Sequence, residues 1–238
     1  MRLYRGLNPI KAMTFDLDDT LYDNWPVIMK VEEEMAKWLF SQHPIASSLT
    51  LDEWHQVKIQ VAKSNPALKH DVTLWRETQI KQGLVQLGYK QAEASAAAKA
   101  GIEYALWLRN QVDVPEETHR VMQSLSEKLP LVAITNGNVD PHKIGLGEYF
   151  QLILKAGPDG RAKPYPDMFN QAQEHLGIKA EHILHVGDHL VSDVYGAKVN
   201  GYQACWFNDK SINIQQASKV RVLPDIEISQ LRDLMRLI

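Results

Sequence analysis

Three aspartates, Asp16, Asp18 and Asp19, follow a short apolar run near the start of the chain. If that run is a strand, Asp16 and Asp18 project to the same side, because side chains alternate along a strand. Two carboxylates in one crevice repel each other unless a proton or a cation lies between them. An isolated acidic triplet is typical of a solvated turn or a helix N-cap, so its meaning depends on the polar groups that join it.

Three further polar sites stand later in the chain. They are Thr135-Asn136-Gly137, Lys163-Pro164, and Asp188 with Asp193. Taken singly, a Thr after a strand often caps a helix and a Lys usually lies on the surface. The two later aspartates, together with the first acidic pair, predict an oxygen-only site for a hard cation such as Mg²⁺.

The elements that must position these groups are short, β-rich runs that end in polar residues or glycine. The runs are Ala12–Asp16, Leu131–Gly137, Gln151–Lys155, Ile183–Asp188 and Gln203–Phe207. Such runs are typical of buried parallel strands that deliver functional groups at their carboxyl ends. A helix is predicted over Pro166–Leu176, with Pro166 in its first turn and Gly177 ending it. The alternation of strands and helices predicts an α/β fold with a doubly wound, Rossmann-like parallel sheet.

The stretch from about Trp25 to Gln111 has no convincing strand and is rich in Glu, Lys, Gln, Ala and Leu. Pro44 and Asn65-Pro66 indicate breaks between its helices. We therefore expect a core of residues 1–22 and 112–238, interrupted by an all-helical insertion of residues 23–111. Such an insertion is tolerable because the entropy of loop closure grows slowly with length.

Composition limits the classes of partner. The chain has 238 residues, 45% of them hydrophobic and 23% charged, and a formal net charge of −3. These values are ordinary for a globular protein, and the charge favours neither nucleic acid nor an anionic membrane as a partner. A single cysteine, Cys205, excludes an internal disulfide. No signal peptide or membrane span is evident, so we expect a soluble, cytoplasmic protein.

In this order, the four polar sites resemble the four motifs of the haloacid dehalogenase-like (HAD) hydrolase superfamily. The run Asp-Leu-Asp-Asp-Thr-Leu over residues 16–21 is a highly specific match, and the resemblance covers the sheet-forming part of the chain. The helical segment is similar in position to the first-type (C1) cap of that superfamily. One departure is His189, which stands where many relatives carry a small polar or acidic residue.

The resemblance implies a phosphatase and a role for each motif residue. Asp16 is the expected nucleophile, forming an aspartyl-phosphate, and Asp18 the general acid and base. Asp16, the backbone carbonyl of Asp18 and Asp188 are expected to hold Mg²⁺. The groups expected to bind the phosphoryl oxygens are Thr135, Asn136 and Lys163. Asp193 is expected to support the site by orienting Lys163 or the waters of the metal.

The whole chain also resembles bacterial members that act on flavin mononucleotide and on the phosphorylated ribitylaminouracil intermediate of riboflavin synthesis. The segment His70-Asp71-Val72-Thr73, followed by Trp75 and Arg76, is part of that likeness. We expect Trp75 and Arg76 to face a ring and a ribityl chain, with Tyr22 and Asn24 lining the same entrance. In the competing interpretation, Trp75 belongs to the core of the insertion and Arg76 is a solvated helix charge.

Three other functions compete with a phosphatase acting on small phosphate esters. A haloacid dehalogenase attacks carbon and needs neither Mg²⁺ nor an acid at Asp18. A phosphomutase has the same motifs but returns the phosphoryl group to a sugar. A non-enzymatic phospho-receiver has no use for an acid–base residue beside its phosphorylated aspartate, so the Asp16/Asp18 pair disfavours it.

Overall fold

The computed structural model describes residues 1–238 and divides into two compact units. The first consists of Met1–Asp23 and Asp113–Ile238, and the second of Asn24–Val112. The second unit is therefore an insertion between two parts of the first. Each unit is described by itself.

The first unit contains a seven-stranded sheet in the order β1-β7-β6-β5-β2-β3-β4. All neighbouring strands run parallel except β1, which is antiparallel to β7. The strands are β1 (Arg2–Leu3), β2 (Ala12–Phe15), β3 (Leu131–Thr135), β4 (Leu152–Lys155), β5 (Ile183–Gly187), β6 (Gln203–Phe207) and β7 (Ile226–Ile228). Because β2 lies between β5 and β3, the three strands expected to carry the motifs are neighbours at the centre.

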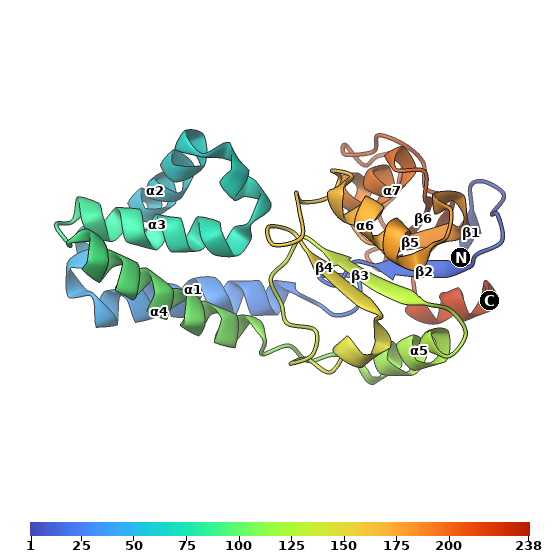
Figure 1. Ribbon diagram of the computed structural model, residues 1–238, viewed down its shortest axis with the longest axis horizontal. Helices are drawn as coiled ribbons and strands as arrows, with labels where there is room; N and C mark the ends of the chain where they lie inside the picture. Colours follow the sequence, from blue (N-terminus) through green and yellow to red (C-terminus); the bar gives the residue numbers. More distant parts are fainter. The chain divides into compact units, whose positions relative to one another are not determined.

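Helices cover both faces of this sheet (Figure 1). Helix α5 (Glu116–Ser126) and the C-terminal 3₁₀ turn Leu231–Arg236 lie on one face, and α6 (Asp167–Leu176) and α7 (Gly196–Val199) on the other. Alternate residues of the strands form the core with α6 and α7, for example Val132 and Ile134 with Met168 and Phe169. Burial of these apolar faces is what fixes each strand's register, because a shift of one residue would expose the whole set.

The predicted fold class is confirmed, with small differences at the strand ends. All five predicted strands are present, and Gly177 ends α6 in the left-handed conformation, with a φ of 63°. Pro166 stands at the N-cap, just before the helix, instead of in its first turn. The edge strands β1 and β7 were not predicted from the sequence; with two and three residues, they are too short to show a periodic pattern.

The second unit is all-helical. Its helices are α1 (Trp25–Gln42), α2 (Leu51–Ser64), α3 (Val72–Gln86) and α4 (Gln91–Arg109). Short 3₁₀ turns at Pro44–Ser48 and Pro66–His70 occupy the two positions where proline predicted breaks. Helix α2 begins with a capping box formed by Thr50 and Glu53, which satisfies backbone donors that the first turn leaves unpaired. No helix in the chain is long and apolar enough to cross a membrane.

Candidate active site

The polar motif residues gather where the central parallel strands end. Asp16 directly follows β2, Thr135 ends β3 and Gly187 ends β5. The backbone N–H of Asp16 still donates to the carbonyl of Val186, at 2.9 Å, so the first aspartate is held by the last ladder bond of the sheet. Ligands of open α/β sheets bind at this edge.

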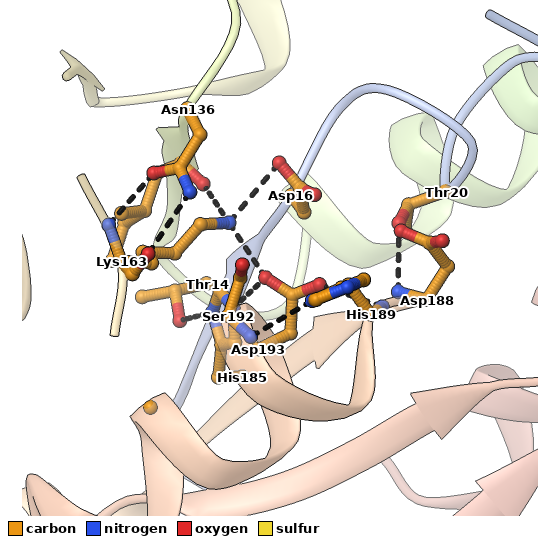
Figure 2. Close-up of polar contacts among 12 residues, drawn as sticks. Thr14, Asp16, Thr20, Asn136, Lys163, His185, Asp188, His189, Ser192 and Asp193 are labelled. Atoms are coloured by element: carbon orange, nitrogen blue, oxygen red, sulfur yellow. Dashed lines mark hydrogen bonds and ion pairs between the residues drawn. The ribbon is translucent and has the colours of Figure 1, made fainter. Parts of the chain in front are cut away.

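Lys163 is the cation of the site, and its side chain is fully buried. Its ammonium lies 3.0 Å from Oδ1 of Asp16 and 2.7 Å from Oδ1 of Asp193. Its third partner is the carbonyl of Ile134, to which it donates at 2.6 Å. Although burial opposes its charge, Asp16 and Asp193 raise the pKa of Lys163 above its ordinary value. All three ammonium protons therefore have acceptors, and the ammonium fixes the direction of Asp16 (Figure 2).

The backbone of Lys163 is held by Asn136. The Asn136 amide accepts from the Lys163 N–H at 2.7 Å and donates to the Lys163 carbonyl at 3.1 Å. In the structure the side chain of Asn136 clamps the backbone of Lys163, which contacts Asp16, the expected nucleophile. Binding of phosphoryl oxygens by Asn136 stays a prediction. Thr135 is completely buried, and its hydroxyl oxygen accepts from the Gly137 N–H at 2.9 Å. Its own proton is left to donate.

Asp193 is buried beneath the end of β5 in a short π-helical turn, Leu190–Tyr195. Its Oδ2 accepts from the backbone N–H of His189 at 2.9 Å, while its Oδ1 contacts both Lys163 and Nε2 of His185. Burial works against its charge, but Lys163 and His185 keep the pKa of Asp193 below its usual range. The carboxylate packs so closely that a Cβ on Gly187 would lie 2.3 Å from its Cγ.

The ring of His189, the residue that departs from the superfamily pattern, closes this same turn. Its Nδ1 accepts from the backbone N–H of Ser192 at 3.0 Å. Burial lowers the pKa of His189, which keeps the ring neutral and Nδ1 available as an acceptor. The residue therefore caps the turn that carries Asp193.

Three carboxylates crowd together at the site. Asp16, Asp188 and Asp193 each present an oxygen within 4.8 Å of the others. Burial is the main cause that raises the pKa of Asp16 well above its ordinary value, and Asp193, Asp18 and Asp188 add to it against Lys163. Burial, with Asp193 and Asp19, raises the pKa of Asp188 to about 7. Such a cluster is stable in its ionised form only with additional positive charge, and its oxygen donors suit a hard divalent cation.

Asp18 is partly buried, and its carboxylate accepts a hydrogen bond from the phenolic hydroxyl of Tyr22. A Cβ on Gly137 would lie 2.2 Å from Oδ2 of Asp18, so only glycine allows this approach. Tyr22, expected from the sequence to line the substrate entrance, thus contacts the expected general acid. Thr20, which the sequence analysis did not select, accepts from the Asp188 N–H at 3.2 Å and links the first and last motifs.

Two polar residues inside the strands were also missed by the sequence analysis. Thr14 and His185 are both fully buried, and their side chains are hydrogen-bonded at 2.8 Å. The available signal was a polar residue within an otherwise apolar, buried strand, which requires a partner. Sequence alone does not say which partner it has.

The expected specificity residues of the second unit lie as follows. Asn24 is buried and begins helix α1. The Trp75 indole donates to the carbonyl of Lys58 at 2.8 Å, and its ring packs against the buried cluster of Val57, Val61 and Leu68. Arg76, on the same helix α3, forms an ion pair with Glu32 of α1. Trp75 and Arg76 therefore both have contacts within their own unit. That they face the substrate stays a prediction.

The chain is similar to known hydrolases in both sequence and structure. The family model for haloacid dehalogenase-like hydrolases matches residues 10–201. The 5-amino-6-(5-phospho-D-ribitylamino)uracil phosphatase YigB of Escherichia coli (strain K12) is 46% identical over 100% of both chains. Phosphoserine phosphatase of Thermus thermophilus is 26% identical, covering 94% of this chain and 97% of its own. A crystal structure of 2-haloacid dehalogenase from Pseudomonas syringae pv. Tomato DC3000 superposes with a TM-score of 0.89 at 33% identity, covering 96% and 97% of the two chains.

Proposed function

Since this chain belongs to the haloacid dehalogenase-like hydrolase family, we propose that it is a phosphatase of small phosphate monoesters with Asp16 as its nucleophile. The observation that carries the proposal is the setting of Asp16. Its buried carboxylate is aimed by Lys163 at 3.0 Å, beside Asp188 in a cluster of oxygen donors, with a second acid, Asp18, two residues on. A nucleophile, a proton donor and a cation site are the three parts that phosphate ester hydrolysis requires.

The reaction proceeds in two steps. A carboxylate oxygen of Asp16 attacks phosphorus, the bond between phosphorus and the ester oxygen breaks, and protonated Asp18 gives its proton to the leaving alkoxide. A water molecule then gives its proton to Asp18 and attacks the aspartyl-phosphate, which releases inorganic phosphate and regenerates Asp16. Asp18 thus ends each cycle in the protonated form in which it began.

The cation that fits this site is Mg²⁺. Asp16, Asp188 and the backbone carbonyl of Asp18 would hold it, and when bound it neutralises the charge between a carboxylate nucleophile and a phosphate dianion. Asp193 contributes differently, since Lys163, His185 and the His189 backbone already occupy its oxygens. We assign to Asp193 the orientation of Lys163.

The hydrogen-bond donors for the phosphoryl oxygens would come from Thr135, Asn136 and Lys163. The Thr135 hydroxyl has a proton to donate, and Asn136 offers its backbone N–H while its side chain holds Lys163. For Lys163 to bind a phosphoryl oxygen, one of its three present contacts must lengthen. These groups supply the positive potential that a chain with a net charge of −3 lacks overall.

For the substrate, we propose 5-amino-6-(5-phospho-D-ribitylamino)uracil and flavin mononucleotide. The support is the full-length relative that carries the first of these in its name and the aromatic and cationic residues Trp75 and Arg76, which suit a ring and its ribityl chain. For Tyr22 and Asn24 we propose a contribution to the choice of leaving group. We also propose that the enzyme acts in the cytoplasm.

The similarity to a solved 2-haloacid dehalogenase makes displacement of halide from carbon the second candidate. That reaction needs no protonated leaving group and no cation, so it would leave Asp18 and the acidic cluster without a use.

The test is a panel of phosphate esters, assayed for phosphate release with Mg²⁺ and with EDTA, beside 2-chloropropionate assayed for chloride release. We expect Mg²⁺-dependent phosphate release, and an Asp16→Asn variant reduced by several orders of magnitude with its fold retained. Chloride release in EDTA without phosphate release would instead establish the dehalogenase. If Asp16→Asn kept a tenth of the wild-type rate, Asp16 would not be the nucleophile.

A further inference from the structure

Thr14 and His185 form a buried polar pair that no step of the proposed reaction uses. They face each other across the neighbouring strands β2 and β5, where they are register partners. Their side chains are 0% and 1% exposed, and Oγ1 of Thr14 lies 2.8 Å from Nδ1 of His185. Burying two polar side chains in a sheet is costly unless each hydrogen bond is made, so the pair calls for an explanation.

The direction of each hydrogen bond follows from the partners. Burial lowers the pKa of His185, so the ring is neutral and carries one proton. Nε2 lies 3.2 Å from Oδ1 of Asp193, an ionised carboxylate that can only accept. The proton therefore sits on Nε2, Nδ1 is the acceptor, and the Thr14 hydroxyl donates to it. Asp193 thus selects the tautomer, and Thr14 supplies the proton that the unprotonated Nδ1 accepts.

These bonds belong to a closed ring (Figure 2). From His185 the contacts run through Asp193 to Lys163, and from Lys163 to Asp16, at 3.2, 2.7 and 3.0 Å. Asp16 and Thr14 stand two residues apart, at the end of strand β2 and within it, which closes the ring through the backbone. Thr14 and His185 are therefore connected to Asp16 both through this series of contacts and through the backbone of strand β2.

We propose that Thr14 and His185 are a positioning pair that sets how Lys163 is shared between Asp193 and the nucleophile Asp16. The proposal rests on the role of Asp16 in the proposed function. His185 and Lys163 both donate to the same oxygen, Oδ1 of Asp193. Donation from His185 satisfies part of that charge and leaves the ammonium free to engage Asp16.

Without the His185 donor, Oδ1 would have Lys163 as its one side-chain partner. The ammonium would then be drawn towards Asp193 and away from Asp16, and the nucleophile would lose the contact that aims it. Neither Thr14 nor His185 reaches the surface, so neither contacts the substrate, and the change acts on the aim of Asp16. The expected signature is a fall in kcat with little change in KM.

Packing alone is the competing explanation. The buried His185 ring meets the ring of Phe169, a residue of helix α6, edge-on, with centroids 5.2 Å apart. If the histidine only filled space, its loss would lower the stability of the fold and leave the turnover of each folded molecule unchanged.

Three substitutions separate the two explanations. His185→Phe keeps a ring of similar size but removes the donor, His185→Gln keeps an N–H donor near the position of Nε2, and Thr14→Val removes only the hydroxyl. We expect His185→Phe to lower kcat about 10-fold with KM within about twofold, because a hydrogen bond to a charged group is lost. His185→Gln should recover most of that loss. The double variant Thr14→Val/His185→Phe should be no slower than His185→Phe, since Thr14 then has no ring to orient.

The matched control is Thr118→Val. Thr118 is also a buried threonine, whose hydroxyl donates to the Leu21 carbonyl at 2.9 Å outside the ring of contacts. It should lower the melting temperature as Thr14→Val does, yet leave kcat unchanged. A wild-type kcat in His185→Phe, or an equally low kcat in His185→Gln, would overturn the positioning role.

A spectroscopic test separates this proposal from the proposed function. In protein labelled with ¹⁵N-histidine, the ring signals that disappear in His185→Phe should show a protonated Nε2 and an unprotonated, hydrogen-bonded Nδ1 from about pH 6 to about pH 8. A protonated Nδ1 would overturn the ring geometry whatever the substrate. If this tautomer is found but no phosphate ester is hydrolysed, the proposed function is wrong while the hydrogen-bonded geometry stands. The kcat values of the variants are then compared in whichever reaction Asp16 performs.

Discussion

Replacing Asp188 by asparagine should stabilise the metal-free protein while abolishing its activity. The pKa of Asp188 is raised from an ordinary 3.8 to about 7, chiefly by burial and then by Asp193 and Asp19. An unfolded chain carries Asp188 ionised above about pH 4, whereas the fold resists that charge up to about pH 7. The contribution of Asp188 to stability is therefore most favourable at low pH and falls as the pH rises between these values. Asparagine keeps the shape of the side chain and removes the charge.

The magnitude follows from the same two values. A difference of about three pH units between the folded and unfolded pKa corresponds to about 4 kcal/mol above pH 7. Solvent reaches part of the carboxylate, so we take half of this, about 2 kcal/mol. For a chain of this size, that is a rise in melting temperature of roughly 4–8 °C. At about pH 5 the folded carboxyl is already protonated, and the gain should fall to less than half.

The assay is thermal unfolding of wild type and Asp188→Asn in EDTA, at about pH 5 and about pH 8. Mg²⁺ should then raise the melting temperature of the wild type and not of the variant, because a ligand stabilises only the state that binds it. Asp209→Asn, which removes an exposed carboxylate from the loop after β6, is the matched control and should change little. If Asp188→Asn is no more stable than wild type in EDTA at pH 8, or gains equally at both pH values, the crowding argument is wrong.

Three further outcomes are expected. Asp18→Asn should retain measurable burst phosphorylation with p-nitrophenyl phosphate but lose turnover of alkyl phosphates, because p-nitrophenolate barely needs an acid; equal losses on both would contradict the acid role. EDTA should silence the enzyme, Mg²⁺ should restore it, and Ca²⁺ should restore it poorly because it prefers higher, looser coordination; full activity in EDTA would contradict the metal site. Arg76→Ala and Trp75→Ala should each lower kcat/KM for flavin mononucleotide about 10-fold and leave kcat/KM for acetyl phosphate nearly unchanged. Equal losses on both substrates, or a melting temperature several degrees lower, would instead give the substituted residue a structural role.

The strands and motif positions could be predicted because they depend on local pattern. Each central strand is a short apolar run buried on both faces, and each ends in a residue that breaks the run, such as Asp16 after β2. Since parallel strands end at one edge of the sheet, proximity of Asp16 and Asp188 follows from topology alone. The edge strand β1 lacked any such signal, because its two residues acquire their identity only by pairing with β7.

Side-chain direction could not be predicted in the same way. The position of Asn136 did not reveal that its side-chain amide clamps the backbone of Lys163; its binding of phosphoryl oxygens stays a prediction. Tyr22 was expected at the entrance, and its hydroxyl reaches Asp18. In both cases the residue type is compatible with several partners, and rotamers and neighbouring backbone decide among them. The sequence therefore identified which residues gather and not which atoms they engage.

Charge in the buried site explains why these contacts are arranged as they are. Three carboxylates, Asp16, Asp188 and Asp193, stand against one ammonium, Lys163, which leaves two negative charges when all are ionised. The charge of Asp193 is balanced by Lys163 and stabilised by hydrogen bonds from the neutral His185 ring and the His189 N–H, so the excess falls on Asp16 and Asp188. A divalent cation matches that excess, whereas a monovalent one leaves half of it. The proposed positioning network on the Lys163 side and the proposed cation site on the Asp188 side thus meet at Asp16, whose carboxylate would need both to stay ionised and aimed.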